Sequence, residues 1–319
     1  MVAMRILILG AGGTGGYFGG RLAQAGCDVT FLVRPARAAR LRAEGLVIRS
    51  PQGDARLPVP VIETSATLAP DFDLVVLSCK AYDLDAAIAA IAPAMRRPGV
   101  TLLPLLNGLR HFETLDAAFG APQVLGGLCH ISVTLNAAGE IHHLNQLQSL
   151  TFGERDPAAS PDRCERIGAT LARASFDARH STNVMAALWE KFAFMAAGAS
   201  LTCLMRASVA DIVASAEGER VARSLVGECA TIARVAGYPV SEKAASFAAR
   251  MLLGKDSPFK ASMLRDIEAG GRVEADHLVG DMLRRGREAG QDVSLLAVAH
   301  AHLKAYERSR TVTSPSAST

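Results

Sequence analysis

A glycine-rich turn close to the amino terminus constrains this chain more than any other feature. Residues 5–9 (RILIL) form a short apolar run that predicts a buried parallel strand, and residues 17–25 are typical of a helix. Between them, residues 10–15 (GAGGTG) have the G-x-G-x-x-G spacing. This context predicts a dinucleotide-binding turn, because the N-terminus of the helix offers N–H groups and a positive dipole end to phosphates. The alternative is a glycine-rich turn without a ligand.

Each residue of the turn has an expected place in that site. Gly10 permits the tight turn, Gly12 lets the backbone approach a pyrophosphate, and Gly15 allows the helix to pack closely against the strand. Gly13 and Thr14 lie at the same helix N-terminus, so we expect them to belong to the phosphate site as well.

The end of the second strand predicts which dinucleotide is bound. Residues 28–33 (DVTFLV) are followed by Arg34, Arg37 and Arg40, and no acidic residue occurs before Glu44. A carboxylate here would accept hydrogen bonds from the ribose hydroxyls of NAD, whereas a guanidinium matches a 2′-phosphate. We therefore expect NADP(H). The alternative, a solvated helix face, applies more to Arg40 than to Arg34.

Composition excludes several other classes of protein. The chain has 319 residues, half of them apolar, which suits two domains with a sizeable core. A net charge of +3 favours neither nucleic acid nor a membrane surface as a partner. The six cysteines are scattered without a C-x-x-C pair, which indicates reduced thiols, no metal site and a cytoplasmic protein. We expect no signal peptide and no apolar run that spans a bilayer.

The amino-terminal part alternates between strand and helix patterns, which indicates a doubly wound parallel sheet. Further strands are expected at residues 46–50, 57–62, 73–78 and 100–103, and helices at 35–44, 84–95, 111–119 and 161–174. Residues 124–153 alternate in short segments that predict an antiparallel extension of this domain.

From residue 183 the strand signals end and Ala-rich helical stretches follow. We expect helices at residues 184–205, 208–214, 217–236, 241–252, 260–268, 273–289 and 294–307. The fold class is therefore α/β, with an N-terminal Rossmann-type doubly wound sheet (residues 1–182) followed by an all-helical C-terminal domain (residues 183–310). The Ser/Thr-rich tail, residues 311–319, is expected to be disordered.

Polar residues that follow strands or stand on apolar helices are the candidates for chemistry. Ligands of open parallel sheets bind beyond the carboxyl ends of the strands, where Lys80 could reach a phosphate or ribose and Asn107 the nicotinamide ribose or a substrate. In the helical domain, Lys191 could donate a proton and Ser262, at a loop-to-helix start, could bind a carboxylate. The alternatives are a solvated side chain for Lys80 and Lys191, ordinary turn chemistry for Asn107, and a helix cap for Ser262.

These residues together resemble the ketopantoate reductase (2-dehydropantoate 2-reductase) family over nearly the whole chain. The resemblance rests on the glycine turn, Arg34, Cys79-Lys80-Ala81, Asn107-Gly108, Trp189-x-Lys191, Ser262-Met263-x-x-Asp266 and Glu274-x-Asp276. It implies that Lys191 is the general acid, that Glu274 is a partner of substrate and lysine, and that Ser262 anchors the substrate. Asn107 is implied at the junction of cofactor and substrate.

The chain also departs from the pattern of that family. The lysine helix typically carries substrate-binding asparagines four and eight residues after the lysine, and these positions are Met195 and Ala199 here. An asparagine three residues before the serine is Phe259, with Lys260 as a possible replacement charge. Losing a partner for a substrate hydroxyl can cost on the order of 10⁴-fold in discrimination. Reductase chemistry is therefore expected to survive better than specificity for pantoate.

The function that this resemblance implies is NADPH-dependent reduction of a 2-oxo acid to a 2-hydroxy acid, as in the ketopantoate step of pantothenate biosynthesis. Two alternatives remain open: a divergent paralogue that reduces a more apolar 2-oxo acid, and a non-catalytic NADP(H)-binding sensor. We expect a small-molecule substrate as the partner, and a monomer or homodimer.

Overall fold

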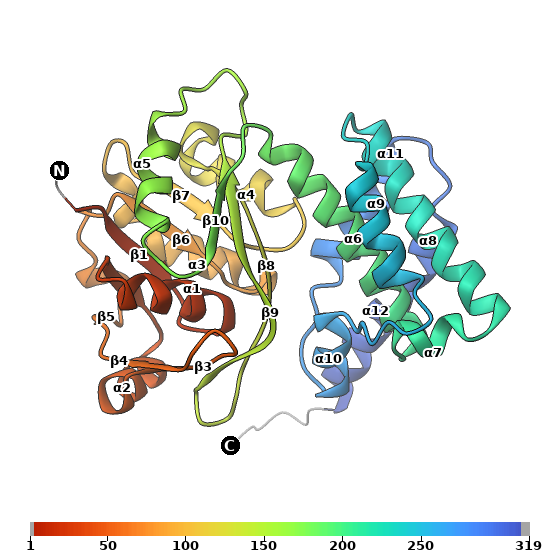
Figure 1. Ribbon diagram of the computed structural model, residues 1–319, viewed down its shortest axis with the longest axis horizontal. Helices are drawn as coiled ribbons and strands as arrows, with labels where there is room; N and C mark the ends of the chain where they lie inside the picture. Colours follow the sequence, from red (N-terminus) through yellow and green to blue (C-terminus); the bar gives the residue numbers. More distant parts are fainter. Residues whose placement is uncertain (1–2, 314–319) are drawn as a thin grey trace. The chain divides into compact units, whose positions relative to one another are not determined.

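The computed structural model describes residues 3–313, which divide into two compact units (Figure 1). The first unit extends to Leu106 and resumes at His111–Val184, and the second comprises Asn107–Arg110 and the chain from Met185 onward. The division thus falls two residues after the expected boundary, and it assigns the short segment after residue 106 to the second unit. Of the tail that was expected to be disordered, residues 311–313 end helix α12, and residues 314–319 lie outside the described residues.

A parallel five-stranded sheet forms the centre of the first unit, as the sequence predicts. Its strands have the order β5-β2-β1-β6-β7, with β1 (Arg5–Leu9), β2 (Asp28–Leu32), β5 (Val61–Ile62), β6 (Leu74–Leu77) and β7 (Thr101–Pro104). Apart from Leu9 and the edge strand β5, which are half-buried, the apolar strand residues are almost fully buried, which explains why these runs do not alternate with polar residues. The helices of this unit are α1 (Gly13–Gln24), α2 (Pro35–Glu44), α3 (Leu84–Ile91), α4 (His111–Phe119) and α5 (Asp162–Leu171).

A second sheet contains the antiparallel extension and differs from the prediction. The single strand expected at residues 57–62 is wrong, because Leu57 ends β4 in this sheet and Val61–Ile62 forms β5 in the other. Its path is β10-β9-β3-β4, and β8 also pairs with β9; the strands are β3 (Leu46–Arg49), β4 (Ala55–Leu57), β8 (Gly126–Leu135), β9 (Ile141–Gly153) and β10 (Asp177–His180). The segments expected as separate strands after residue 139 form one long strand, because β9 pairs with β8 along almost its whole length. The parallel strand β10 was not expected, since its sequence, DARH, has no apolar pattern.

Helix α1 lies between the two sheets, and glycines on opposite faces allow this. A Cβ atom at Gly19 would lie 2.7 Å from the ring of Phe31 in the first sheet. A Cβ at Gly16 or Gly20 would lie 2.4 Å from Ile141 or 2.6 Å from Leu46, both in the second sheet. Contacts under 3 Å are too close for any larger residue, so the glycines of α1 set the spacing between the sheets.

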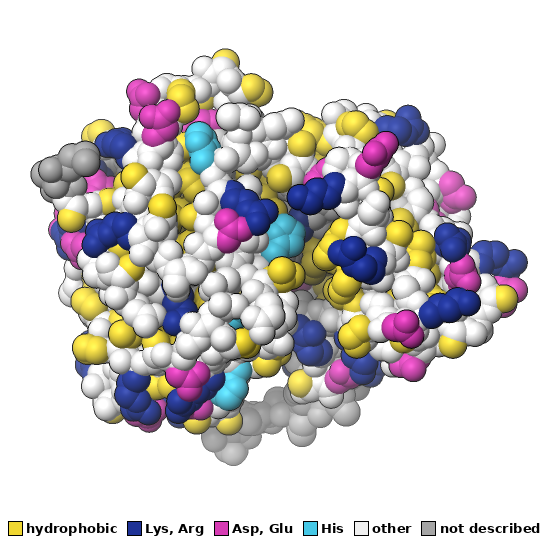
Figure 2. Space-filling view, in the orientation of Figure 1, with side chains coloured by type: hydrophobic (Ala, Val, Ile, Leu, Met, Phe, Trp, Pro, Cys, Tyr) yellow, Lys and Arg dark blue, Asp and Glu magenta, His cyan; other side chains and the backbone are white. Residues whose placement is uncertain are grey.

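The second unit is all helical, as expected. Its helices are α6 (Val184–Met205), α7 (Val209–Val213), α8 (Ala216–Val235), α9 (Glu242–Leu252), α10 (Ser262–Glu268), α11 (Asp281–Glu288) and α12 (Ser294–Thr313). The helix expected at residues 273–289 is different: it opens with a π-helical turn, η5 (Asp276–Gly280), before α11 continues. On the face shown in Figure 2, acidic and basic side chains are interspersed over both units, consistent with the small net charge.

Helix α6 corrects one expectation about membranes. By length and composition it is the one helix among the described residues that is apolar enough to cross a bilayer, although no such segment was expected. However, 61% of its most apolar window is buried inside the structure. Packing in the core of the second unit accounts for its apolar composition.

The start of helix α12 is capped by a side chain from helix α8, and this contact allows a test of the stability of the second unit. Both carboxylate oxygens of Glu228 on α8 accept hydrogen bonds, each 3.1 Å long, from the backbone N–H groups of Leu295 and Leu296 in the first turn of α12. Glu228→Ala removes both acceptors, so we expect it to lower the free energy of unfolding by about 1–2 kcal/mol. Urea denaturation measures this, and Glu219→Ala is the control because the half-buried Glu219 pairs with Arg223 one turn along α8 and not with the start of another helix among the described residues. Equal effects in both variants would contradict the capping role.

Candidate functional site

The glycine turn has the geometry that a pyrophosphate requires. Gly10 has a φ of +87°, which turns the chain away from the strand, and its N–H donates to the carbonyl of Leu32 in β2 (2.9 Å), which continues the ladder between β1 and β2 to the start of the turn. A Cβ at Gly15 would lie 2.2 Å from Ser78 Oγ and 2.6 Å from the Gly10 carbonyl oxygen, so the predicted close packing of helix and strand is confirmed. A Cβ at Gly12 would meet no atom within 4 Å. Among the described residues no side chain caps α1, so its first N–H groups and the open space beside Gly12 fit a phosphate ligand.

The candidate residues of the first unit emerge at one edge of the parallel sheet. The last residues of four strands are register partners across the sheet: Leu9, Leu32, Leu77 and Pro104. Because the strands are parallel, the residues that follow them leave the same edge. Thr14 and Lys80, which are both half-buried, and the exposed Arg34 follow three of these strands.

Arg34 has an acidic neighbour that the sequence analysis did not weigh. Its Nη2 lies 3.2 Å from Oδ1 of Asp83, and the Arg34 side chain is 79% exposed. Asp83 belongs to the short helical turn after β6, three residues beyond Lys80. An acid that is absent from the end of β2 is therefore supplied after β6, two strands away in the sheet. Its position three residues after Lys80 was the available signal.

In the second unit, a small hollow collects most of the predicted substrate residues. Its lining includes Asn107, Met195, Ala199, Ser262 and Glu274, all singled out from the sequence. Residues that sequence reasoning missed complete the lining: Ala261, Met263, His277 and Leu278. One carboxylate, one amide and one hydroxyl thus share a hollow whose other walls are mostly apolar, which is the composition of a small-molecule site.

His277 is the most informative of the missed residues. It lies three residues after Glu274, and this helical spacing was the signal that could have identified it. Burial is the main cause that holds the pKa of His277 below its usual range, although the carboxylates of Glu274 and Asp281 and a hydrogen bond to the Asn107 backbone oppose this. The imidazole is therefore neutral near neutral pH. It belongs to a π-helical turn, and such turns are frequent at functional sites.

The segment that carries Asn107 is fixed against this π-helical turn. Arg110 donates from Nη1 to the carbonyl oxygen of Asp276 (3.2 Å). Gly108 has a φ of +79°, and a Cβ there would lie 3.1 Å from the carbonyl oxygen of His277. These contacts, with the hydrogen bond of His277, hold the half-buried Asn107 at the hollow.

The start of α10 is tied to α6, which places Ser262. The Thr202 hydroxyl donates to the Gly198 carbonyl (2.7 Å) and accepts from the backbone N–H of Ala261 (3.3 Å). Ala261, not Ser262, is the N-cap residue, so the helix-cap alternative for Ser262 is wrong. The half-buried ring of Phe259 packs against that of Phe194 on α6, with centroids 5.4 Å apart, and is not among the residues that line the hollow.

The two candidate lysines lie in different surroundings. Lys191 is half-buried on α6, one helical turn before Met195 and two before Ala199. Lys260 is not among the residues that line the hollow, and its ammonium forms an ion pair with Glu268 (2.9 Å). Lys260 is therefore paired with Glu268 and does not replace the family's asparagines at the hollow. Asp276 also has structural partners, His300 (2.8 Å) and Lys304 (2.7 Å) of α12.

The fold and these two groups of residues define a class of protein: one that has a Rossmann-like unit with a glycine turn suited to a dinucleotide and a helical unit with a small polar and apolar hollow. Comparison with known proteins specifies the class. The family model "Ketopantoate reductase PanE/ApbA" matches residues 6–157, and the model of its C-terminal domain matches residues 183–307. The chain belongs to the ketopantoate reductase family of NAD(P)H-dependent oxidoreductases.

Individual relatives cover almost the whole chain. An "Uncharacterized oxidoreductase YkpB" of Bacillus subtilis is 37% identical over 95% of this chain and 99% of its own length. A 2-dehydropantoate 2-reductase of Nostoc is 27% identical, with 93% of each chain covered. The crystal structure of 2-dehydropantoate 2-reductase from Geobacter metallireducens superposes with a TM-score of 0.85 at 27% identity, over 95% of this chain and 99% of that one.

Proposed function

We propose that this protein reduces a 2-oxo acid with an apolar side chain to the 2-hydroxy acid, with NADPH as the reductant. The observation that carries the proposal is the hollow in which Asn107, Ser262 and Glu274 share a wall with Met195 and Ala199. The polar residues suit the carboxylate and carbonyl end of a 2-oxo acid. Ketopantoate, the substrate implied by the names of several relatives, is the second candidate.

The chain's own residues supply binding and proton chemistry in this proposal. The cofactor supplies the hydride when it is bound. Ser262 and Asn107 orient the substrate by hydrogen bonds, and the ammonium of Lys191 polarises the keto oxygen and donates a proton to it. Glu274 offers an acceptor for the lysine or for the product hydroxyl. The apolar lining excludes water from the side-chain end, which strengthens the polar contacts.

The proposed preference for NADPH rests on Arg34, whose exposed guanidinium lies just after the end of β2, where it could contact a 2′-phosphate. Asp83 competes for the same guanidinium and repels a phosphate.

Arg34→Glu should raise the Kd for NADPH by roughly 10–100-fold, the scale of a charge-assisted hydrogen bond, and should change the Kd for NADH little. Asp83→Asn should lower the Kd for NADPH by up to about fivefold, since exposed ion pairs contribute at most about 1 kcal/mol. Fluorescence titration measures both, and equal loss of NADPH and NADH in Arg34→Glu would contradict a phosphate role.

Proton donation by Lys191 is tested by its removal. Lys191→Ala should lower kcat by roughly 10²–10⁴-fold, the usual contribution of a general acid, and should leave the Kd for NADPH within about threefold. Lys243→Ala, at an exposed position on α9, is the matched control and should retain full activity. Steady-state kinetics at saturating substrate check this, and near-full kcat in Lys191→Ala would exclude the lysine from the mechanism. Absence of turnover with every 2-oxo acid, together with tight NADPH binding, would favour the sensor alternative instead.

Met195 and Ala199, which replace the asparagines typical of the family, lead us to expect a preference for an apolar substrate. 3,3-Dimethyl-2-oxobutanoate is ketopantoate without its hydroxyl group, so the pair isolates the contact that asparagines would make. We expect the wild type to use the deoxy acid at least as well as ketopantoate, and Met195→Asn with Ala199→Asn to shift the kcat/KM ratio toward ketopantoate by about tenfold or more. Met195→Leu keeps an apolar side chain and should leave the ratio nearly unchanged. A wild-type preference for ketopantoate of tenfold or more would overturn the apolar assignment.

A further inference from the structure

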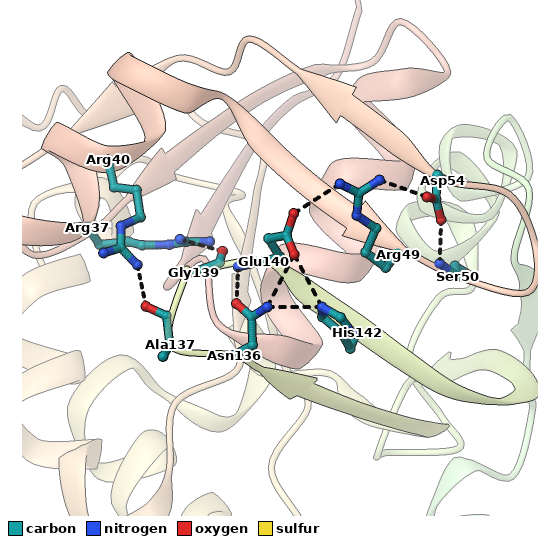
Figure 3. A network of polar contacts seen from close by, with 10 residues as sticks. All are labelled: Arg37, Arg40, Arg49, Ser50, Asp54, Asn136, Ala137, Gly139, Glu140 and His142. Atoms are coloured by element: carbon teal, nitrogen blue, oxygen red, sulfur yellow. Dashed lines mark hydrogen bonds and ion pairs between the residues drawn. The ribbon is translucent and has the colours of Figure 1, made fainter.

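Arg37 joins two segments of the first unit that lie far apart in the sequence. From helix α2, its Nε donates to the carbonyl oxygen of Ala11 in the glycine turn (3.0 Å). Its Nη1 donates to the carbonyl oxygen of Gly139, at the tip of the β8–β9 hairpin (2.8 Å; Figure 3). One planar guanidinium therefore fixes the position of the turn relative to the hairpin tip.

The hairpin tip is itself rigid and closely fitted to α2. The side chain of Asn136 accepts from the N–H of Glu140 (2.8 Å), and Arg40 donates to the Ala137 carbonyl (2.9 Å; Figure 3). Gly139 has a φ of +75°, and a Cβ there would lie 2.6 Å from Arg37 Nη1. The positive φ favours glycine at this position, and the two arginines pack directly against it.

Fold stability alone is a poor explanation for Arg37. Burial is the main cause that lowers its pKa, and the neighbouring charge of Arg40 lowers it further. Its Nη2 is buried and has no hydrogen-bond partner among the described residues. Burying a cation with an unpaired donor is costly, and an apolar residue could fill the space without that cost.

We propose that Arg37 is a positioning residue for the cofactor: it holds the glycine turn in the shape that receives the pyrophosphate. This inference rests on the proposed binding of NADP(H). Its Nε and Nη1 bond to backbone carbonyls and its Nη2 is buried, so we infer that Arg37 acts through the turn and not on the 2′-phosphate. Its contribution is the same for NADPH and NADH, in contrast to that of Arg34.

The experiment compares Arg37→Gln and Arg37→Lys with Arg40→Gln, because Arg40 bonds to the Ala137 carbonyl of the hairpin tip and not to the glycine turn. We expect both Arg37 variants to raise the Kd for NADPH and for NADH by roughly 10–100-fold, with the ratio of the two unchanged within about twofold. Lysine keeps the charge but lacks the planar fork, so it should not rescue binding. Arg40→Gln should change either Kd by less than about threefold. At saturating cofactor, kcat should be retained in all three.

Hydrogen exchange of the free protein gives a readout without cofactor. Amides of residues 10–13 should exchange faster in the Arg37 variants, whereas Arg40→Gln should affect only the hairpin tip. A loss of affinity for NADPH but not for NADH, or unchanged cofactor binding in Arg37→Lys, would overturn the inference. The Arg37→Lys result decides the case even if Arg37→Gln fails to fold. A wild type that binds neither cofactor would overturn the proposed function itself, whereas an Arg37 failure alone leaves that function standing.

Discussion

The first unit depends on how closely helix α1 approaches two sheets at once. Gly15 and Gly19 face the parallel sheet, and Gly16 and Gly20, one position further, face the second sheet. With i, i+4 spacing, each pair forms a flat stripe on its own side of the helix. A larger residue in either stripe would separate one sheet from α1 and displace the helix N-terminus, where the phosphate-binding geometry lies. The same residues therefore specify packing and site geometry.

Apolar contact and directional hydrogen bonds have different tasks around the glycine turn. Packing of α1 fixes distances, because interiors are close-packed and contacts under 3 Å allow no adjustment. It does not fix how the flexible turn itself is oriented, since Gly10 and Gly12 have few steric restraints. The hydrogen bond from Arg37 to Ala11 provides that restraint from outside the turn. A site made of permissive backbone thus needs a rigid neighbour.

The sequence predicts the parts of this protein that depend on local pattern. The parallel strands, helix α6 and the hollow around Ser262 and Glu274 all follow from apolar runs or from the family resemblance. What it did not predict depends on partners distant in sequence. Strand β10 exists because β9 offers a free edge, and the pairing of Arg34 with Asp83 arises because β2 and β6 end at the same edge. The π-helical turn at His277 likewise has a partner distant in sequence, since Arg110 bonds to the carbonyl of Asp276.

The hollow shows that polarity and size select a substrate through different residues. In this conformation it has about 10 Å³ of free volume, room for about one water molecule. The half-buried Met195 has an unbranched, flexible side chain that can change rotamer. Ala199 is buried and has no rotamer to change. Under the proposed function, Met195 therefore adjusts the room for a substrate, whereas Ala199 is a fixed apolar wall. Polar recognition is left to Asn107, Ser262 and Glu274, whose groups suit the 2-oxo acid end that all candidate substrates share.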